Sequence, residues 1–184
     1  MDNVRSLILM PGIWNSGPTH WQTLWEAANP ASVRFSPPDW ERPVRAEWIA
    51  ALEAAVVMAP EPPVLVAHSL SCLLVPMWAA KSSSRVAGAF LVAPVDPAEP
   101  AFPEAATGFR DVPREPLPFP SLVVGSLDDP YAGVEFARGF AADLGAEFIV
   151  AGALGHINAD SGLGDWPQGQ ELLAGFVKGV RGGS

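Results

Sequence analysis

An abrupt change of pattern at Ser69 constrains the fold more than any other feature of this chain. Residues 64–67 form a short apolar run that is typical of a buried strand, and a helix-compatible apolar run begins at Leu70. A strand that turns sharply into a helix at a serine is the context of a nucleophile elbow, in which the hydroxyl stands above the edge of a sheet. Elbows usually have glycine two residues before and after the serine, whereas this chain has Ala67 and Ser71. The same pattern also fits a buried strand and helix joined by a serine-containing turn without any chemistry.

Two later segments favour the elbow interpretation. Asp128 and Asp129 follow the apolar run 121–125, so a pair of carboxylates stands at the C-terminal end of a predicted strand. His156 lies further along, in a glycine-containing loop after another apolar run. Serine, then acid, then histidine is the chain order of the triad in α/β-hydrolases. The order therefore predicts a serine nucleophile that is activated by an imidazole.

The roles of these residues follow from the chemistry of the serine hydroxyl, which is a poor nucleophile until a base takes its proton. Ser69 is the predicted nucleophile and His156 the predicted base. Asp128 and Asp129 compete for the carboxylate that orients the imidazole; we favour Asp129 because it stands directly before the turn into the next predicted helix. The other aspartate is then expected to cap that helix or to hydrogen-bond the loop. His68, inside the elbow, is expected to be packed or locally hydrogen-bonded.

An acyl transfer site also needs two backbone N–H groups that point at the oxyanion. In an elbow one donor is the residue after the serine, here Leu70. The second donor is predicted to be the amide of Ile13 or Trp14, in the glycine-containing loop after the first predicted strand. The side chains of Trp14 and Trp166, in loops that bracket the site, are predicted to form a substrate wall. His20 is expected either to line the pocket or to cap its helix.

Strands and helices alternate along the chain with short connections, which predicts an α/β fold of three layers: a mostly parallel sheet of six strands with helices on both faces. Right-handed crossovers with the strand order 2-1-3-4-5-6 would bring the serine, acid and histidine to one edge of the sheet. We expect one domain over residues 1–184, in which the proline-rich stretch 94–120 forms a short cap. The predicted strands are 6–10, 33–35, 64–67, 86–92, 121–125 and 147–150, and the predicted helices 19–28, 43–58, 70–80, 131–144 and 168–180.

Composition argues against several classes of partner. The net charge of −9 and the lack of a Lys/Arg cluster exclude the basic footprint that nucleic acid and anionic membranes require. No apolar run reaches the roughly 18 residues of a membrane span, and the start of the chain leaves no room for a signal peptide. Cys72 is the only cysteine, so no internal disulfide can form, which fits the cytoplasm. The sequence has no CxxC, HExxH or phosphate-loop motif, so neither a metal nor a cofactor is expected.

Several short motifs also resemble a known family. They are Met10-Pro11-Gly12, His20-Trp21, Ala67-His68-Ser69, Ser126-Leu127-Asp128-Asp129-Pro130 and Gly155-His156. Over nearly the whole chain they are similar to those of the small serine hydrolases related to retinoblastoma-binding protein nine. The resemblance implies a minimal α/β-hydrolase that lacks the first two strands of the larger fold, with a triad of Ser69, Asp129 and His156. Ser71 stands where this family usually has glycine.

These observations predict a hydrolase of small carboxylic esters or amides, aminopeptidases included, that acts through an acyl-serine intermediate. One alternative is a binding or scaffold protein that keeps the fold but has little catalysis, which the missing elbow glycines favour. Another is an acyltransferase, which would use the same triad but pass the acyl group to an acceptor other than water. A small molecule is the expected partner; the sequence names neither its identity, nor a protein partner, nor an oligomeric state.

Overall fold

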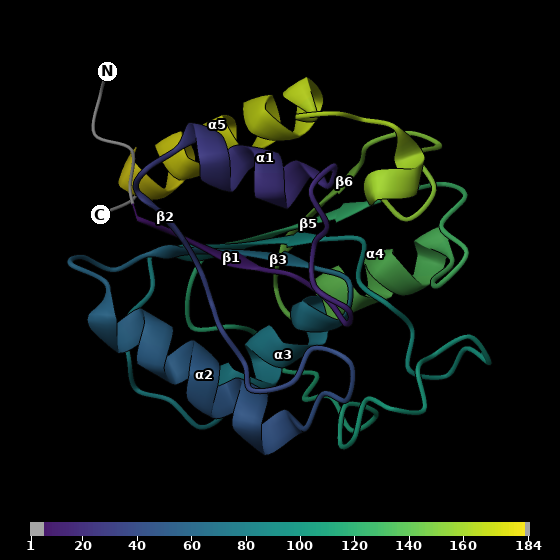
Figure 1. Cartoon of the computed structure of the whole chain (residues 1–184), viewed down its shortest axis with the longest axis horizontal. Helices are drawn as coiled ribbons and strands as arrows, with labels where there is room; N and C mark the ends of the chain where they lie inside the picture. Colours follow the sequence, from purple (N-terminus) through teal and green to yellow (C-terminus); the bar gives the residue numbers. More distant parts are fainter. Residues whose placement is uncertain (1–5, 183–184) are drawn as a thin grey trace.

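The computed structural model describes residues 6–182 and contains one parallel six-stranded sheet in the order β2-β1-β3-β4-β5-β6 (Figure 1). Every neighbouring pair of strands is parallel, and the order is the predicted one. The strands are β1 (Leu7–Met10), β2 (Ser32–Arg34), β3 (Val64–His68), β4 (Gly88–Val92), β5 (Ser121–Gly125) and β6 (Glu147–Val150). The helices are α1 (Trp21–Ala28), α2 (Arg45–Met58), α3 (Leu70–Ala79), α4 (Val134–Asp143) and α5 (Pro167–Gly182), with a 3₁₀ turn η1 (Ala159–Ser161).

Helices cover both faces of the sheet, which confirms the predicted three layers. Helices α1 and α5 lie on one face, and α2, α3 and α4 lie on the other (Figure 1). An apolar core fills each interface; Trp48 and Leu73 belong to one core, and Trp21 and Phe90 to the other. Strands β1, β3, β4 and β5 are buried along their whole lengths, as expected for parallel strands packed on two sides.

Two helices begin later than predicted because a side chain closes the turn before them. Helix α1 begins at Trp21 because His20 is its N-cap and accepts a hydrogen bond from the Gln22 amide. Helix α4 begins at Val134, three residues late, because residues 129–133 form a turn in which the Asp129 carboxylate accepts from the Tyr131 amide. This turn leaves the carboxylate at the end of β5.

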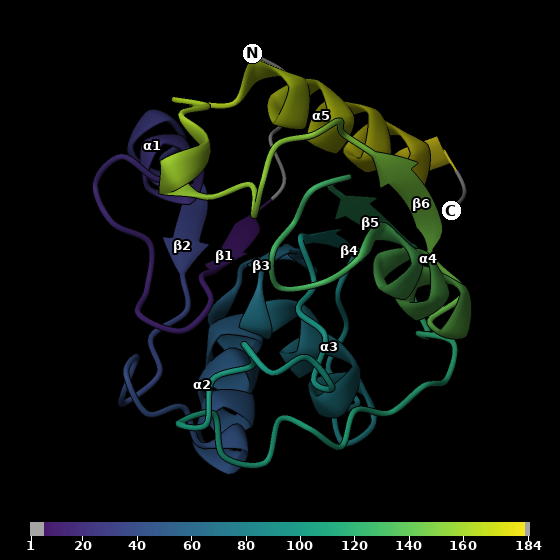
Figure 2. The same ribbon diagram turned by 90° about the vertical axis from the view of Figure 1, so that its right-hand side faces the viewer.

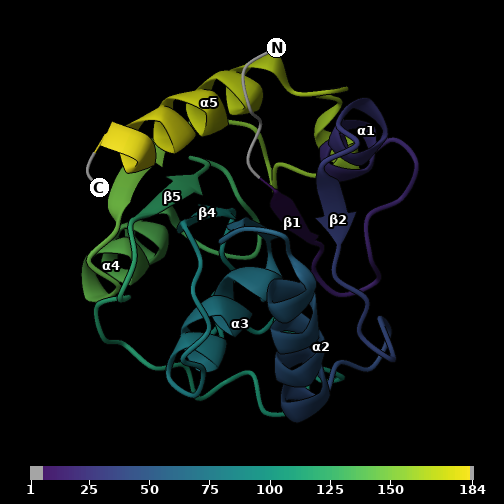
Figure 3. The same ribbon diagram turned by 90° about the vertical axis from the view of Figure 1, so that its left-hand side faces the viewer.

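The segment 94–120 was predicted to form a short cap. It runs past the ends of α2 and α3 (Figures 2 and 3), and Thr107 bridges to Val44 just before α2. Phe102 and Phe109 of this segment are buried in the core on the α2–α3 face. Their burial removes more apolar area from water than a position at the pocket would.

Two expectations about membranes concern different parts of the chain. Within residues 6–182, no helix is both long and apolar enough to cross a bilayer. The expectation that the first residues leave no room for a signal peptide falls on positions 1–5, which lie outside the described residues.

Candidate active site

Ser69 sits in a sharp turn between β3 and α3. Its backbone angles, φ 58° and ψ −123°, lie in a region that residues with a Cβ rarely adopt. Hydrogen bonds hold this turn on both sides: the Ser69 amide donates to the Val92 carbonyl, and the Cys72 amide donates to the Ser69 carbonyl, both at 3.0 Å. The turn lifts the Ser69 side chain off the end of the sheet.

The loop after β1 passes very close to Ser69. A Cβ added to Gly12 would lie 2.8 Å from the Ser69 Cβ and 3.1 Å from its Oγ, so only glycine fits there without a shift. Ser71, in the first turn of α3, is completely buried, and its hydroxyl donates to the Pro11 carbonyl at 2.5 Å. The serine in place of the usual elbow glycine therefore joins α3 to this loop.

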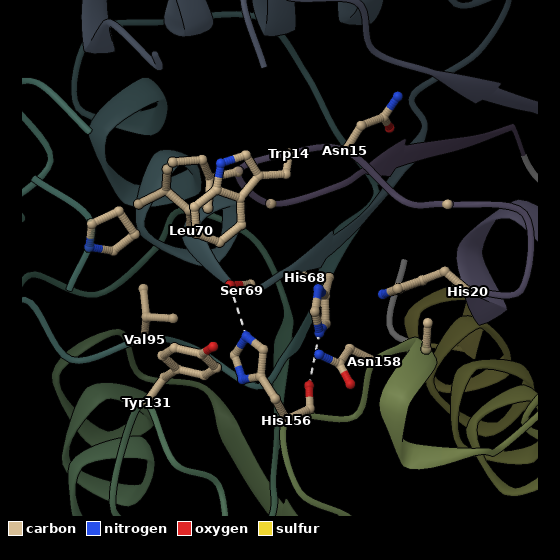
Figure 4. Close-up of a pocket in the computed structure, with 15 residues that line it drawn as sticks. Trp14, Asn15, His20, His68, Ser69, Leu70, Val95, Tyr131, His156 and Asn158 are labelled. Atoms are coloured by element: carbon tan, nitrogen blue, oxygen red, sulfur yellow. Dashed lines mark hydrogen bonds between the residues drawn. The ribbon is translucent and has the colours of Figure 1, made fainter. Parts of the chain in front are cut away.

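A chain of hydrogen bonds runs from Ser69 through His156 to Asp129. The Ser69 hydroxyl lies 2.9 Å from His156 Nε2 (Figure 4), and His156 Nδ1 lies 2.9 Å from both carboxylate oxygens of Asp129. The imidazole and the carboxylate are nearly buried, with side-chain exposures of 8% and 3%. Tyr131 packs against the imidazole with ring centroids 4.5 Å apart. Three side chains from distant parts of the sequence thus meet in one line.

The neighbouring aspartate has a different role. Asp128 Oδ1 accepts hydrogen bonds from the Gly155 amide at 2.7 Å and from the Ser126 hydroxyl at 2.9 Å. The Gly155 N–H, followed by the Ser126 hydroxyl, lowers the pKa of the Asp128 carboxyl. Asp128 therefore joins the loop after β5 to the loop that carries His156, which agrees with its alternative prediction as a loop-bonding residue.

Two buried ring N–H groups hold the backbone at His156. His68 Nε2 donates to the His156 carbonyl at 2.9 Å, and the Trp21 indole donates to the Ile157 carbonyl at 2.8 Å. Burial, together with the neighbouring rings of His20 and His156, lowers the pKa of His68 well below the usual value. No role at the site was predicted for Trp21; its place next to His20 in the sequence was the one signal for this contact.

The two candidates for the second oxyanion donor differ in the structure. The Trp14 amide donates to the Trp40 carbonyl at 2.8 Å, so it is not free for a substrate. Among residues 6–182, nothing accepts a hydrogen bond from the amides of Ile13 or Leu70. The geometry therefore leaves Ile13 and Leu70 as the pair of available donors beside Ser69 and corrects the prediction for the Trp14 amide.

A cavity of about 190 Å³ opens at Ser69 and His156. Leu70, Val95 and Tyr131 lie on one side of this pair, and His20 and Asn158 lie on the other (Figure 4). Of the segment 94–120, Val95 and Pro103 line the cavity. The Trp14 side chain lines it as predicted and is 64% exposed.

Trp166 does not reach this cavity, in contrast to its prediction as a substrate wall. It is 2% exposed and packs against Trp21 and Trp25, with ring centroids 5.2 and 6.0 Å away. The physical reason is burial: a loop tryptophan that can join an aromatic cluster under α1 removes its whole ring from water. Trp25 donates in turn to the Asp165 carbonyl at 2.6 Å, which fixes this loop to α1.

Comparison with known proteins decides the family. The model of the serine hydrolase family matches residues 7–175. The chain belongs to the serine hydrolase family. A protein described as a YdeN-like hydrolase, from Pectobacterium atrosepticum, is 28% identical, with a TM-score of 0.86 over 95% of this chain and 91% of its own. The ydeN gene product from B. subtilis is 19% identical, with a TM-score of 0.80 over 95% of this chain and 100% of its own.

A more distant structure has the same fold. Alpha/beta hydrolase domain-containing protein 10 from mouse is 14% identical, with a TM-score of 0.68 over 95% of this chain and 88% of its own. A comparison with curated protein sequences gives no match. These findings confirm the resemblance seen in the motifs: the chain is a small serine hydrolase of the minimal α/β-hydrolase type.

Other reactive groups of the hydrolase do not form a second centre. Cys72 is buried, and burial raises the pKa of its thiol well above the usual value, so it is a small core residue. No group of three or more His, Cys, Asp or Glu side chains within the described part of the chain is arranged to hold a metal ion.

The buried histidines make the stability of the hydrolase depend on pH. Burial, the Arg34 cation and His156 lower the pKa of His20 from 6.5 to about 4. Between these values the unfolded chain binds a proton at His20 that the folded chain does not, so the free energy of unfolding falls as the pH falls. Over the whole range, the lowered pKa of His20 changes the free energy of unfolding by roughly 3 kcal/mol, because each pKa unit corresponds to about 1.36 kcal/mol.

Urea unfolding of the wild type and of His20→Asn from pH 7 to pH 4.5 measures this effect. The wild type is expected to lose more stability than the variant, by up to about 1.4 kcal/mol per pH unit. Parallel losses in the two proteins would contradict a neutral, buried His20.

Proposed function

We propose that this serine hydrolase cleaves short, uncharged carboxylic esters through an acyl-serine intermediate, with Ser69 as nucleophile, His156 as base and Asp129 as the orienting acid. The observation that carries the proposal is the chain of three 2.9 Å contacts from the serine hydroxyl through both imidazole nitrogens to the carboxylate. It ends in a cavity large enough for a small substrate.

The proposed reaction begins when Ser69 Oγ attacks the ester carbonyl carbon and His156 Nε2 takes the hydroxyl proton. The carbonyl oxygen becomes an oxyanion, which the Leu70 and Ile13 amides stabilise by donating hydrogen bonds. When the carbon–oxygen bond to the alcohol breaks, the proton on Nε2 passes to the leaving oxygen. Water then attacks the acyl-serine with the same base, releasing the acid and restoring Ser69. Throughout the reaction the Asp129 carboxylate accepts a hydrogen bond from the Nδ1–H of His156 and so stabilises the imidazolium.

The cavity lining favours esters over the amides of an aminopeptidase. The residues that line it are apolar or neutral polar, and none is Asp, Glu, Lys or Arg. An aminopeptidase has to bind a free ammonium group next to the scissile bond, and a desolvated charge without a partner costs several kcal/mol. An uncharged ester has no such cost.

The alternative of a scaffold protein without catalysis rested on the missing elbow glycines. Ala67 lies in β3 fully buried, and the buried Ser71 has a hydrogen-bond partner, so both fit beside Ser69. Reaction with a fluorophosphonate separates a hydrolase or acyltransferase from a scaffold, because only an activated serine is labelled. Hydrolysis in the presence of added alcohols or amines then separates water from another acyl acceptor.

The two aspartates give the first prediction about activity. Asp129→Asn is expected to lower kcat by roughly 10⁴-fold, because an amide favours the wrong imidazole tautomer. Asp128→Asn is the matched control: its amide oxygen can still accept from the Gly155 N–H, so a much smaller loss is expected. Steady-state kinetics on p-nitrophenyl acetate measure both. Equal losses, or a larger loss at Asp128, would move the acid to Asp128.

The size of the cavity predicts the preferred acyl length. A volume of about 190 Å³ is below the usual 300–1,000 Å³ of sites for drug-sized ligands. Each buried methylene contributes about 0.8 kcal/mol only where there is room for it. The ratio kcat/KM for p-nitrophenyl esters is therefore expected to peak between acetate and butyrate and then to fall. A ratio that keeps rising to decanoate would indicate a deep acyl channel instead.

A further inference from the structure

His20 is a buried side chain with a hydrogen-bonding group left over. The residue is 5% exposed and lines the cavity. Its Nδ1 accepts from the Gln22 amide at 3.2 Å, so in the neutral ring the proton sits on Nε2. The low pKa of about 4 agrees with a neutral ring. No residue among 6–182 forms a hydrogen bond with Nε2, which leaves an N–H donor beside the cavity.

Asn158 adds a second donor on the same side of the cavity (Figure 4). Its side-chain oxygen caps η1 by accepting from the Asp160 amide at 3.1 Å. That bond assigns the oxygen, so the NH₂ group is the part of the side chain left for other partners. In the described part of the chain, nothing accepts from this NH₂ group.

These donors lie on the side of the site that we assign to the leaving alcohol. The rings of His156, His68 and His20 follow one another, with centroids 4.9 and 4.8 Å apart. Since the proposed mechanism passes the proton of His156 Nε2 to the leaving oxygen, that oxygen lies next to His156, and the rest of the alcohol can extend along this row of rings toward His20. The opposite side, with Leu70, Val95 and Tyr131, is mostly apolar and suits the acyl chain.

We propose that His20 and Asn158 form a subsite for an uncharged oxygen on the alcohol part of the substrate, so that the preferred substrates are short-chain esters of alcohols with a second hydroxyl or ether oxygen. The inference rests on the proposed esterase function and adds the class of alcohol. It predicts a preference for esters of diols and glycerol-like alcohols over esters of simple alkanols.

A pair of substrates of equal size tests this subsite. In 2-methoxyethyl acetate an ether oxygen replaces one methylene of butyl acetate, and the acyl group is the same. Each kcat/KM is divided by the rate constant for hydrolysis of the same ester by hydroxide without enzyme, which corrects for intrinsic reactivity. The corrected kcat/KM of the wild type is expected to be about three- to tenfold higher for the ether ester, the range of one neutral hydrogen bond. No preference would overturn the inference.

Two variants, each of which keeps the hydrogen bond that caps its helix, test whether His20 and Asn158 cause this preference. His20→Asn retains an oxygen that can accept from the Gln22 amide, but the shorter side chain withdraws the donor. Asn158→Asp retains the oxygen that caps η1 and removes the NH₂ group. The ratio of corrected kcat/KM for the ether ester to that for butyl acetate is expected to fall toward one in each variant. A ratio that stays high in both variants would show that these residues do not form the subsite.

The acyl side supplies the remaining control. Methyl 3-methoxypropionate and methyl pentanoate differ in the same way within the acyl chain, and no preference is expected between them. A preference on this side alone would contradict the placement of the alcohol. If the wild type neither hydrolyses butyl acetate nor reacts with a fluorophosphonate, the proposed function fails and the subsite fails with it; hydrolysis without an oxygen preference overturns the subsite alone.

A different contact assigns a role to Ser71, again on the basis of the proposed function. Its hydroxyl binds the Pro11 carbonyl, two residues before Ile13, and Ser71 directly follows Leu70 on α3. The bond thus joins the two segments whose amides are the proposed oxyanion donors. We infer that Ser71 is a positioning residue, which holds the Ile13 amide at the distance from the Leu70 amide that the oxyanion needs.

Removal of this hydroxyl should affect the transition state more than the ground state. Ser71→Ala is expected to lower kcat about 10- to 100-fold with little change in KM. This loss is smaller than the one seen when an oxyanion donor itself is removed, because the Ile13 amide is displaced but still present. Inhibition by a short alkylboronic acid, which forms a tetrahedral adduct with the serine, should weaken in parallel. Ser71→Gly should behave in the same way. A folded variant with unchanged kcat and unchanged boronate affinity would overturn this role.

Discussion

Replacing Ser69 with alanine is expected to abolish labelling by a fluorophosphonate and to lower kcat for short esters by at least about a thousandfold. The alanine Cβ occupies the same place in the strained turn, so the backbone is unchanged and only the attacking oxygen is lost. Gel-based labelling and steady-state kinetics on p-nitrophenyl acetate measure the two effects.

Ser82→Ala is the matched control for this substitution. The Ser82 hydroxyl donates to Glu53 beyond the end of α3, away from the cavity, so its loss should leave labelling intact. Full labelling of the Ser69→Ala protein would show that another residue carries the reaction.

Replacing His156 with alanine is expected to cause a loss of kcat similar to that of Ser69→Ala, because the hydroxyl then has no base. Residues that act as one unit are not additive, so the double variant Ser69→Ala/His156→Ala should be no worse than either single variant. The comparison needs kcat values for all three proteins on one ester.

The other two histidines distinguish the base from its neighbours. His68 contacts the carbonyl of His156 rather than the serine, and His20 lies beyond His68. His68→Ala and His20→Ala are therefore expected to retain a measurable rate. A His68→Ala protein as inactive as His156→Ala would show that the wrong imidazole has been assigned.

The strand order and the meeting of Ser69 with His156 could be predicted from the sequence because their signals are local. Short apolar runs mark each strand, and right-handed crossovers between parallel strands leave few possible orders. The turn at Ser69 was visible as a change from a strand pattern to a helix pattern within a few residues. The boundary of α4 was less visible, since a side chain at Asp129 closes the turn before it.

The errors concern contacts between loops that are far apart in the sequence. The Trp14 amide donates a hydrogen bond to the Trp40 carbonyl, and no sequence pattern in either loop predicts that bond. Trp166 joins an aromatic cluster under α1, whereas a loop tryptophan looks the same in a sequence whether it faces a pocket or a core. Phe102 and Phe109 of the segment 94–120 are likewise buried in the core. A one-dimensional pattern gives the apolar character of a side chain but not the surface that it covers.

The most direct test of the proposed function is to locate the covalent adduct. The hydrolase is incubated with a fluorophosphonate, digested and analysed by peptide mass spectrometry, with the His156→Ala protein in parallel. The proposal predicts one adduct, on Ser69 in the peptide that spans the end of β3 and the start of α3, and greatly reduced modification in His156→Ala. An adduct on a different residue, or ester hydrolysis that persists after Ser69 has been fully modified, would contradict it.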